Sequence, residues 1–502
     1  MIRRLLALAF TAVFAMSVCF AEKPNLESVY PTAAARRQTN TITLAGKFEP
    51  WPPKFWCSTA GIEATFSTNK NKVDLVVNAE AKAGPCLVRF YNDEGASDPV
   101  IFVVSEKAQL ADTEPNNHFA KPQVLTNLPV EMNGRLDKNN DVDSFAFSIK
   151  AGQWLDAKLE SHTLMSKIDA VLRLVTTNGY QLAWNHDFAS FDPRIVWQAP
   201  YDQTVVLQVF GFLYPANSEI ALSGGNGGVY QLSIATEAEA PKDLNAPLNE
   251  EAKFSLTNCP MVVGAICPAG DEDKFPIQLK KDDSIEVRID ATEFGSDLDP
   301  WVKITDTAGK ELARNDDAEG SRDAVLEWKA PADGEFNIVV GSLTHRGDES
   351  WRYGLQIEKT APDFRATVEA NSFVLESTGT NEVKVGTKRL RGLTNELSVA
   401  IEKLPEGLTV EPAKVDAKAN EATLKVITTD AAAFNAPIRI LVKDEVTGEQ
   451  RPVLFSFVSR SENNGVPGGY SKLLVEQTED IWLTIKPPKE KPAEKPAGKP
   501  AG

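Results

Sequence analysis

The residues Asp141-Val142-Asp143-Ser144-Phe145 recur 130 residues later as Asp271-Glu272-Asp273-Lys274-Phe275. The same offset relates Asp187 to Asp317, and each of these follows a turn that contains a glycine. Agreement over about 60 positions is too long for chance and indicates two copies of one domain. The period is far longer than that of a solenoid repeat, so each copy should carry its own hydrophobic core.

The two aspartates of the repeated stretch should share one face of a strand. Asp141 and Asp143 are two residues apart, and Phe145 and Phe147 continue the same parity. Side chains alternate between the two faces of a strand, so the carboxylates should lie at the edge of the apolar face. A carboxylate there needs a partner, because a desolvated charge is costly.

Short alternating runs around this stretch predict an all-β fold. Both copies have five such runs, with turn residues every 8–12 positions, which is typical of an antiparallel sandwich. The predicted strands are 144–149, 154–159, 170–175, 205–209 and 230–234 in the first copy, and 274–279, 284–289, 301–305, 336–340 and 353–357 in the second.

The same pattern extends to both sides, so the chain is predicted to be a tandem array of β-sandwich domains. The two flanking segments are expected to be immunoglobulin-like. The predicted divisions are a signal peptide (1–21), an N-terminal sandwich (22–106), the first copy (107–236), the second copy (237–360), a C-terminal sandwich (361–485) and a disordered Lys/Pro-rich tail (486–502).

The N-terminal residues predict export. Arg3-Arg4 precedes an apolar run from Leu5 to Phe20, and Cys19-Phe20-Ala21 places small residues where a signal peptidase reads them. We expect cleavage after Ala21 and a secreted, periplasmic or cell-surface protein. No other segment approaches the roughly 20 apolar residues of a membrane helix, so no membrane span is expected.

The charge balance is acidic. The net charge is −17, and becomes −19 once the two arginines of the leader are removed. Such a charge argues against nucleic acid and anionic membranes as partners. It suits an extracellular protein or one that collects divalent cations.

Four cysteines remain after the leader, and export makes disulfides the expected state. Three pairings are open. Because each local pair falls inside one predicted domain, Cys57–Cys86 and Cys259–Cys267 are the predicted bonds.

The repeated acids suggest a cation site in each copy. Asp and Asn after a glycine turn commonly cap backbone amides, and this is the first interpretation. The second is Ca²⁺, which prefers oxygen ligands, although no EF-hand pattern is present. The candidate calcium ligands are Asp141, Asp143, Asp187, Asp271, Asp273 and Asp317. No other cofactor is expected.

Several aromatic residues lie in predicted loops rich in Pro or Gly. Such residues suit stacking on sugar rings or docking of proteins. The alternative is that they plug the ends of small sandwich cores. The candidate ligand-binding residues are Trp51, Trp56, Phe210, Phe212 and Tyr214.

The first copy resembles the bacterial pre-peptidase C-terminal (PPC) domain. The resemblance rests on Asp112-Thr113-Glu114-Pro115-Asn116-Asn117, on Gly134-Arg135-Leu136 and on the stretch from Asp141 to Phe145. The second copy fits the later half of the pattern but has Ala240-Pro241-Lys242-Asp243 where the Glu-Pro-Asn start should be. The resemblance implies a jelly-roll-like sandwich that accompanies secreted proteases without being catalytic.

The start of the N-terminal sandwich resembles an IPT/TIG domain, through Pro24 to Pro31 and then Ile42 to Gly46. Trp51-Pro52-Pro53 departs from that pattern by inserting an aromatic loop.

The sequence offers no common catalytic motif. Neither HExxH nor GxSxG occurs, and the small β-domains leave no room for a large catalytic fold. We therefore expect no enzyme, but a secreted multidomain protein for extracellular or cell-surface binding or attachment. Its partner would be an extracellular protein or a polysaccharide. The alternative is an accessory subunit of an exported protease or glycoside hydrolase.

Overall fold

The computed structural model describes residues 21–188, 191–214, 221–242, 244, 246–257, 259–318, 321–411, 413–459 and 473–487. The predicted signal peptide, up to residue 20, and the tail beyond residue 487 lie outside these ranges. Within them every element is a β-strand except one 3-10 helix, η1 (Thr292–Phe294), which confirms the all-β prediction. Among the described residues, no helix is long and apolar enough to span a bilayer.

The N-terminal sandwich packs two sheets around a core that includes Leu75, Val88 and Phe90. In the order of their pairing, the strands of one sheet are β1 (Asn25–Tyr30), β3 (Gln38–Lys47), β6 (Lys72–Val77) and β5 (Ile62–Phe66), and those of the other are β2 (Ala33–Ala35), β9 (Val100–Ser105), β7 (Gly84–Asn92) and β4 (Lys54–Cys57), with β8 (Gly95–Ala96) beside β7.

The first copy has two five-stranded sheets, and Phe145 and Phe147 lie in the core between them as their parity predicts. One sheet is β10 (Gln109–Ala111), β12 (Val130–Arg135), β19 (Val229–Glu237), β14 (Trp154–Glu160) and β17 (Arg194–Gln198), and the other is β11 (Gln123–Val124), β13 (Asp143–Ile149), β18 (Gln203–Leu213), β15 (Ile168–Thr176) and β16 (Gln181–Asn185).

The second copy repeats this strand order, except that its described residues contain no strand equivalent to β10. One sheet is β21 (Val262–Ala265), β28 (Arg352–Lys359), β23 (Ser284–Asp290) and β26 (Val325–Lys329), and the other is β20 (Phe254–Ser255), β22 (Glu272–Leu279), β27 (Gly334–Ser342), β24 (Pro300–Asp306) and β25 (Glu311–Asn315). All ten predicted strands of the two copies are present. The shorter strands that flank them carry too few alternating residues to be predicted.

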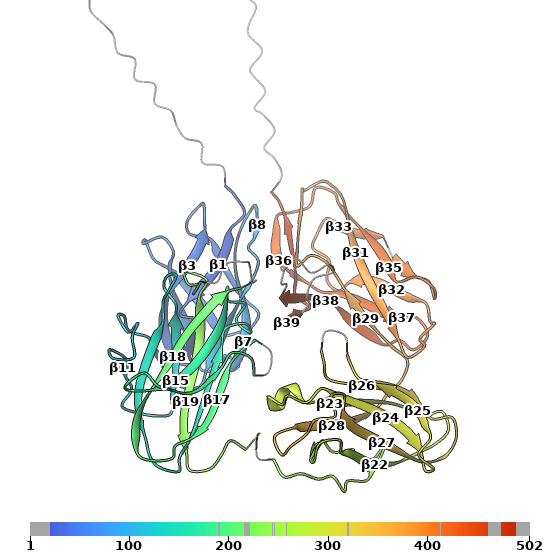
Figure 1. The fold of residues 1–502 in the computed structure, drawn as a ribbon. Helices are drawn as coiled ribbons and strands as arrows, with labels where there is room; N and C mark the ends of the chain where they lie inside the picture. The colour runs from blue at the N-terminus through green and yellow to red at the C-terminus, as the bar shows by residue number, and fades with distance from the viewer. Residues whose placement is uncertain are drawn as a thin grey trace, which may run out of the picture.

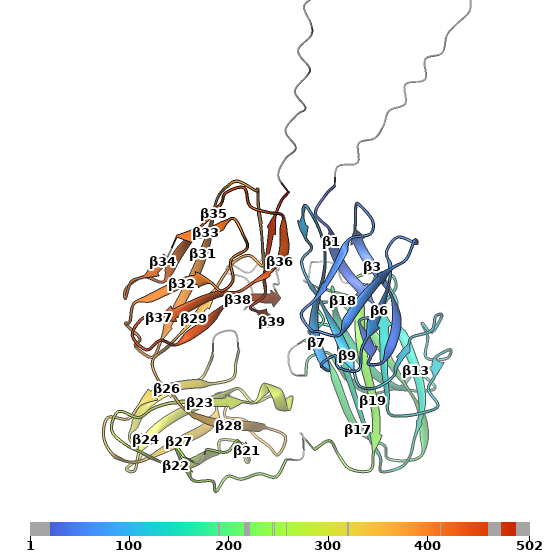
Figure 2. The ribbon, with the colours of Figure 1, turned by 180° about the vertical axis from the view of Figure 1, so that it is seen from behind.

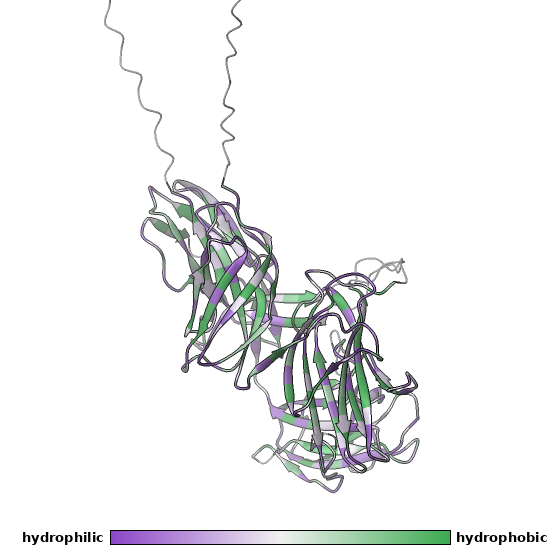
Figure 3. Ribbon diagram, turned by 90° about the vertical axis from the view of Figure 1, so that its left-hand side faces the viewer, coloured by the Kyte–Doolittle hydropathy of each residue, from purple (hydrophilic) through white to green (hydrophobic). Residues whose placement is uncertain are grey.

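The C-terminal sandwich has a large sheet and a small one. The large sheet is β33 (Leu408–Glu411), β35 (Glu421–Thr428), β31 (Gly379–Leu390), β29 (Asp363–Thr367), β38 (Gln450–Ser459), β37 (Ile440–Asp444), β32 (Leu397–Ile401) and β34 (Ala413–Val415), with β39 (Leu473–Thr478) beside β38, and the small one is β30 (Ser372–Leu375), β40 (Ile481–Ile485) and β36 (Phe434–Ile438). Buried residues alternate with less buried ones along a strand of each sandwich, as in β6, β14, β22 and β35. Figure 3 shows hydrophobic and hydrophilic residues alternating along many strands, as a half-buried sheet requires.

The four sandwiches form a closed ring (Figures 1 and 2). The N-terminal sandwich lies against the first copy, and Phe188 of the first copy packs on Gly295 of the second. Arg391 of the C-terminal sandwich bonds Glu286 of the second copy at 2.8 Å. The C-terminal sandwich then returns to the N-terminal one, so each sandwich has two neighbours.

Asn133 holds the joint between the N-terminal sandwich and the first copy. Its Oδ1 accepts hydrogen bonds from the backbone N–H of Thr32 (3.1 Å) and of Ala33 (2.8 Å), and its Nδ2 donates to the carbonyl of Ala33 (3.3 Å). The side chain is buried, so these bonds are shielded from water.

The seam between the C-terminal and N-terminal sandwiches is aromatic. Trp482 packs edge-on against Trp56, with ring centroids 5.7 Å apart. The guanidinium of Arg89 lies 5.6 Å from the ring of Trp56 and 5.1 Å from that of Trp482. Arg89 is fully buried, none of its three nitrogens has a hydrogen-bond partner within the described part of the chain, and burial lowers its pKa to about 10. Cation–π contacts with the two rings therefore take the place of hydrogen bonds here.

Candidate functional site

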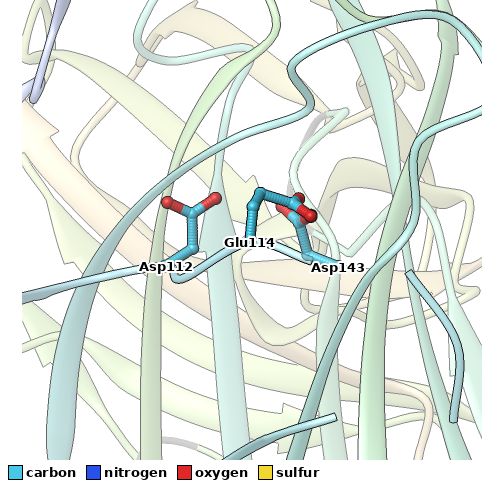
Figure 4. Close-up of side chains that lie close together, drawn as sticks. All are labelled: Asp112, Glu114 and Asp143. Carbon is cyan, nitrogen blue, oxygen red and sulfur yellow. The ribbon is translucent and has the colours of Figure 1, made fainter. Parts of the chain in front are cut away.

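Three carboxylates of the first copy gather at the start of β13. Asp112 and Glu114 come from the segment between β10 and β11, and Asp143 is the first residue of β13. Each offers an oxygen within 4.8 Å of those of the other two. In Figure 4 the carboxylates of Glu114 and Asp143 converge, with Asp112 beside them. We call these three residues the acid cluster.

Asp143 is fully buried and receives a hydrogen bond of 2.5 Å from the hydroxyl of Tyr230. Burial raises the pKa of Asp143 to about 9; the bond from Tyr230 lowers it, and the charges of Asp112 and Asp141 raise it further. With no cation nearby, Asp143 therefore holds a proton at neutral pH. This proton neutralises one carboxylate of the acid cluster and so reduces the repulsion among its acids.

Asn116 offers a test of whether a cation fits the cluster. It is buried, and one end of its amide lies 3.2 Å from Asp143 Oδ1 and 3.3 Å from Glu114 Oε1. Without a cation, the NH₂ group can donate to both the Glu114 carboxylate and the Asp143 carboxyl. With a cation between them, the amide oxygen can face the same point as a ligand. Carboxylate and amide oxygens are the ligands that Ca²⁺ prefers, so these residues fit calcium.

Asp141 is fully buried next to the cluster, but other groups occupy both its oxygens. Oδ2 accepts the backbone N–H of Asp137 at 2.6 Å, and Oδ1 accepts the side-chain amide of Asn117. The structure thus gives Asp141 the turn-capping role that was the first interpretation of the repeated acids.

The second copy keeps only part of this arrangement. Asp273 is buried and accepts a bond of 2.6 Å from the hydroxyl of Tyr353, and burial raises its pKa to about 6. Asp271 Oδ1 accepts a hydrogen bond from the backbone N–H of Glu272. The residues described in this copy contain no second group of three clustered acids. The reason is that the second copy has no match for the segment from Asp112 to Asn117, which supplies Asp112 and Glu114 to the cluster in the first.

Asp187 and Asp317 lie outside the acid cluster. Each follows an edge strand, β16 or β25, and its carbonyl accepts the side-chain amide of the preceding asparagine: Asn185 at 3.0 Å and Asn315 at 2.7 Å. Asp187 also pairs with His186 at 3.4 Å, and it helps to raise the pKa of Asp169 to about 6, after the larger effect of burial. The calcium ligands predicted for each copy are therefore divided between separate places.

Two groups of functional residues were missed by sequence reasoning. Asp112 and Glu114 stand in the motif that suggested the PPC domain, but their register with Asp143 shows only in the fold. Tyr230 and Tyr353 lie 87 and 80 residues after their aspartates, so a comparison at fixed offset does not align them.

The candidate aromatic residues of the N-terminal sandwich are occupied by packing. Trp51 donates from Nε1 to the carbonyl of Ser67 at 2.9 Å and packs edge-on against Phe48 and Phe66. Trp56 belongs to the seam with Trp482. In the first copy, Tyr214 packs on the ring of His162, with centroids 5.6 Å apart. These three rings therefore match the core-plugging alternative.

Phe210 and Phe212 belong to a different environment. On β15 and β18 the residues Asp169, Arg173, Phe210 and Phe212 alternate with core residues and so turn outward. Trp184, opposite Arg173 on β16, is 57% exposed, and Phe212 is 38% exposed. We call this surface, formed by Asp169, Arg173, Trp184, Phe210 and Phe212, the aromatic face.

Two polar groups border the rings of the aromatic face. Arg173 lies over Phe210 at 5.2 Å and donates to Oε1 of Gln208 from two nitrogens, at 3.2 and 2.9 Å. Oδ1 of Asp169 is buried and has no hydrogen-bond partner in the described ranges.

The matching face of the second copy is closed. Trp301 stands at the position of Val171 and is only 5% exposed. Lys303 and Arg314 cover its ring, at 4.5 and 4.7 Å from the centroid. Gly341, opposite Trp301, makes room for it, because a Cβ there would lie 2.3 Å from the indole. The two sandwiches therefore differ on this face: the first has exposed rings, and the second has a ring that two cations cover.

The four cysteines among the described residues, Cys57, Cys86, Cys259 and Cys267, are thiols in the structure. Cys57 and Cys86 are side by side, and the hydrogen bond between the thiols lowers the pKa of Cys57 and raises that of Cys86. Cys259 donates to the carbonyl of Ser255 at 2.8 Å, and Cys267 is exposed. Both disulfides stay predictions.

Comparison with known proteins finds sequence similarity over a short segment of the chain. No family model matches the chain. A probable subtilase-type serine protease of Deinococcus radiodurans is 41% identical over 73 residues, which make up 14% of this chain and 10% of the protease. This chain therefore covers about a tenth of the length of that relative.

Two solved structures are similar over part of the chain. The pre-peptidase C-terminal domain of a Bacillus anthracis collagenase is 11% identical, with a TM-score of 0.18 over 23% of this chain and 99% of that one. A Clostridium perfringens structure of an M60 catalytic domain with two CBM51 domains is 9% identical, with a TM-score of 0.14 over 68% and 55%. Both scores are far below 0.5, so the fold described above rests on its own strand order.

Proposed function

We propose that this chain is an exported, non-catalytic binding protein that attaches to an extracellular protein or polysaccharide through the aromatic face of its first copy. The observation that supports this proposal is the difference between the two copies. In the second copy two cations cover Trp301 on this face, whereas the first copy leaves Trp184 and Phe212 exposed.

Exposed rings on a sheet are unfavourable unless they bind something, because each leaves apolar area in water. The aromatic face joins three rings to one carboxylate and one guanidinium. Such a surface supplies stacking area together with a few groups that fix orientation, which is what a sugar ring or a protein side chain needs.

The acid cluster has a supporting role in this proposal. Asp112 accepts a bond of 2.6 Å from the hydroxyl of Tyr30, a residue of the N-terminal sandwich. A calcium ion bound by Asp112, Glu114 and Asp143 would neutralise acids that otherwise repel one another at this joint. It would therefore stabilise the position of the first copy against its neighbour without taking part in a reaction.

The alternative function is that of an accessory subunit of an exported protease or glycoside hydrolase. The similarity to a short stretch of a probable subtilase-type serine protease favours this alternative. In that case the aromatic face would contact the hydrolase.

Sedimentation with insoluble cellulose, chitin and cell wall tests the proposal. The double variant Trp184→Ala, Phe212→Ala should lower the bound fraction about fivefold or more. Tyr180→Ala is the matched control, because Tyr180 is 74% exposed on the neighbouring turn. A pull-down from an extracellular fraction covers protein partners, and recovery of a hydrolase would support the alternative. Equal retention of all variants by every partner would exclude the aromatic face.

A further inference from the structure

A polar groove runs between the N-terminal sandwich and the first copy, on the sheet opposite the aromatic face. The end of β9 and the residues after it form one wall, and the outward side chains of β12, β14 and β19 form the floor. Its volume is about 430 Å³. This size is within the range of small-ligand sites, which spans about 300–1,000 Å³.

The groove is preformed. Asn133 ties the floor to the N-terminal sandwich through its bonds with Thr32 and Ala33. Lys107 of the wall pairs with Glu131 of the floor at 2.9 Å. Wall and floor are thus fixed to each other, so a ligand would meet little cost of ordering.

The floor holds polar groups that lack complete partners. Gln231 and Glu160 lie directly opposite each other on β19 and β14. The amide nitrogen of Gln231 is buried and has no hydrogen-bond partner among the described side chains and backbone. Glu160 has acidic neighbours, Glu131 and Asp192, while the nearest cation, Lys158, also contacts Asp156 at 3.8 Å. A donor and an acceptor therefore stand side by side, available to a ligand.

The chemistry of the groove excludes other occupants. Three glutamates, Glu106, Glu131 and Glu160, outnumber the two lysines of the lining, Lys107 and Lys158, and so disfavour an anionic ligand. A peptide could not add as an extra strand, because β14 and β19 are interior strands whose backbone groups are already paired. Each hydroxyl of a neutral sugar both donates and accepts, which matches the pair formed by Gln231 and Glu160.

We infer that this groove binds a neutral saccharide. The groove is separate from the aromatic face, so this inference can be tested independently of the proposed function.

Titration calorimetry of the full chain with cellotetraose, maltotetraose and N-acetylated chitotetraose tests this inference. At least one of these sugars should bind, and Gln231→Ala should weaken it about tenfold. Ser233→Trp, which fills the groove from its floor, should abolish binding, while circular dichroism checks that the variant folds. Trp184→Ala on the other sheet should leave the affinity unchanged.

Two results would overturn the inference. One is the absence of binding for all three sugars at millimolar concentration. The other is binding that Trp184→Ala removes and the groove variants leave intact, which would assign the sugar to the aromatic face.

Discussion

The hydroxyl of Tyr230 donates a hydrogen bond of 2.5 Å to the carboxyl of Asp143, and both side chains are buried. The second copy repeats the relationship with Tyr353 and Asp273 at 2.6 Å. In both copies a glycine on the neighbouring strand of the same sheet pairs with the tyrosine and lies against its ring. A Cβ at Gly134 would lie 2.0 Å from Tyr230, and one at Gly264 would lie 2.4 Å from Tyr353. The repeated aspartates therefore mark where a buried tyrosine is held.

Removing one hydroxyl should destabilise the second copy. Tyr353→Phe keeps the ring but leaves Asp273 without its donor, so the free energy of unfolding should fall by about 1–3 kcal/mol. Urea denaturation measures the loss. Phe336→Leu, a core change that breaks no hydrogen bond, serves as a packing control. An unchanged midpoint for Tyr353→Phe would mean that the bond contributes nothing.

Asp273 should make stability depend on pH. Its folded pKa is about 6, above the ordinary value of 3.8. The protonated form is favoured by folding, so the contribution is complete below about pH 4 and is lost as pH rises through 6. Asp273→Asn cannot ionise, and at pH 8 it should be more stable than the native chain by on the order of 2 kcal/mol. The gain should vanish at pH 4. A gain equal at both pH values would contradict the assigned ionisation.

Calcium should raise the melting temperature through the first copy alone. Calcium binding to the acid cluster would remove repulsion among its carboxylates, and it stabilises in proportion to the logarithm of its concentration. Scanning calorimetry in EDTA and in calcium compares the two states. Glu114→Gln should abolish the difference, and Asp317→Asn, outside the cluster, should preserve it. Superimposable native curves in both buffers would rule out the ion.

Asn133→Ala should loosen the joint below the groove. The change leaves the backbone N–H groups of Thr32 and Ala33 without an acceptor, at a cost of about 2–3 kcal/mol. The N-terminal sandwich should then melt as a separate transition, and limited proteolysis between residues 105 and 112 should accelerate. Gln109→Ala, which removes one bond to Asn133 near the surface, is the mild control. Joint melting of both sandwiches in Asn133→Ala would show that other contacts suffice.

The sequence predicted the elements well because strands here follow a strict alternation. The parity of Asp143 and Phe145 correctly placed a carboxyl at the edge of a core. The sequence did not predict which candidate residues lie together where this depends on tertiary contacts. Asp187 shares the repeat offset of Asp143, but the fold places it after β16 and outside the acid cluster. Trp56 sits in a Pro-rich segment that looks exposed, and only the return of the C-terminal sandwich covers it. Neither position can be predicted from the local sequence pattern.

The closed ring also determines how the molecule would carry tension. Lys486, near the last described residue, pairs with Glu94 at 2.8 Å, and Lys23, near the first, lies against Gly95. Both ends of the described chain thus meet at one hairpin. A pull between them would first load the seam of Trp56, Arg89 and Trp482, and the two copies would remain slack until that seam opened. The aromatic seam would then open before the two copies and would shield them from force.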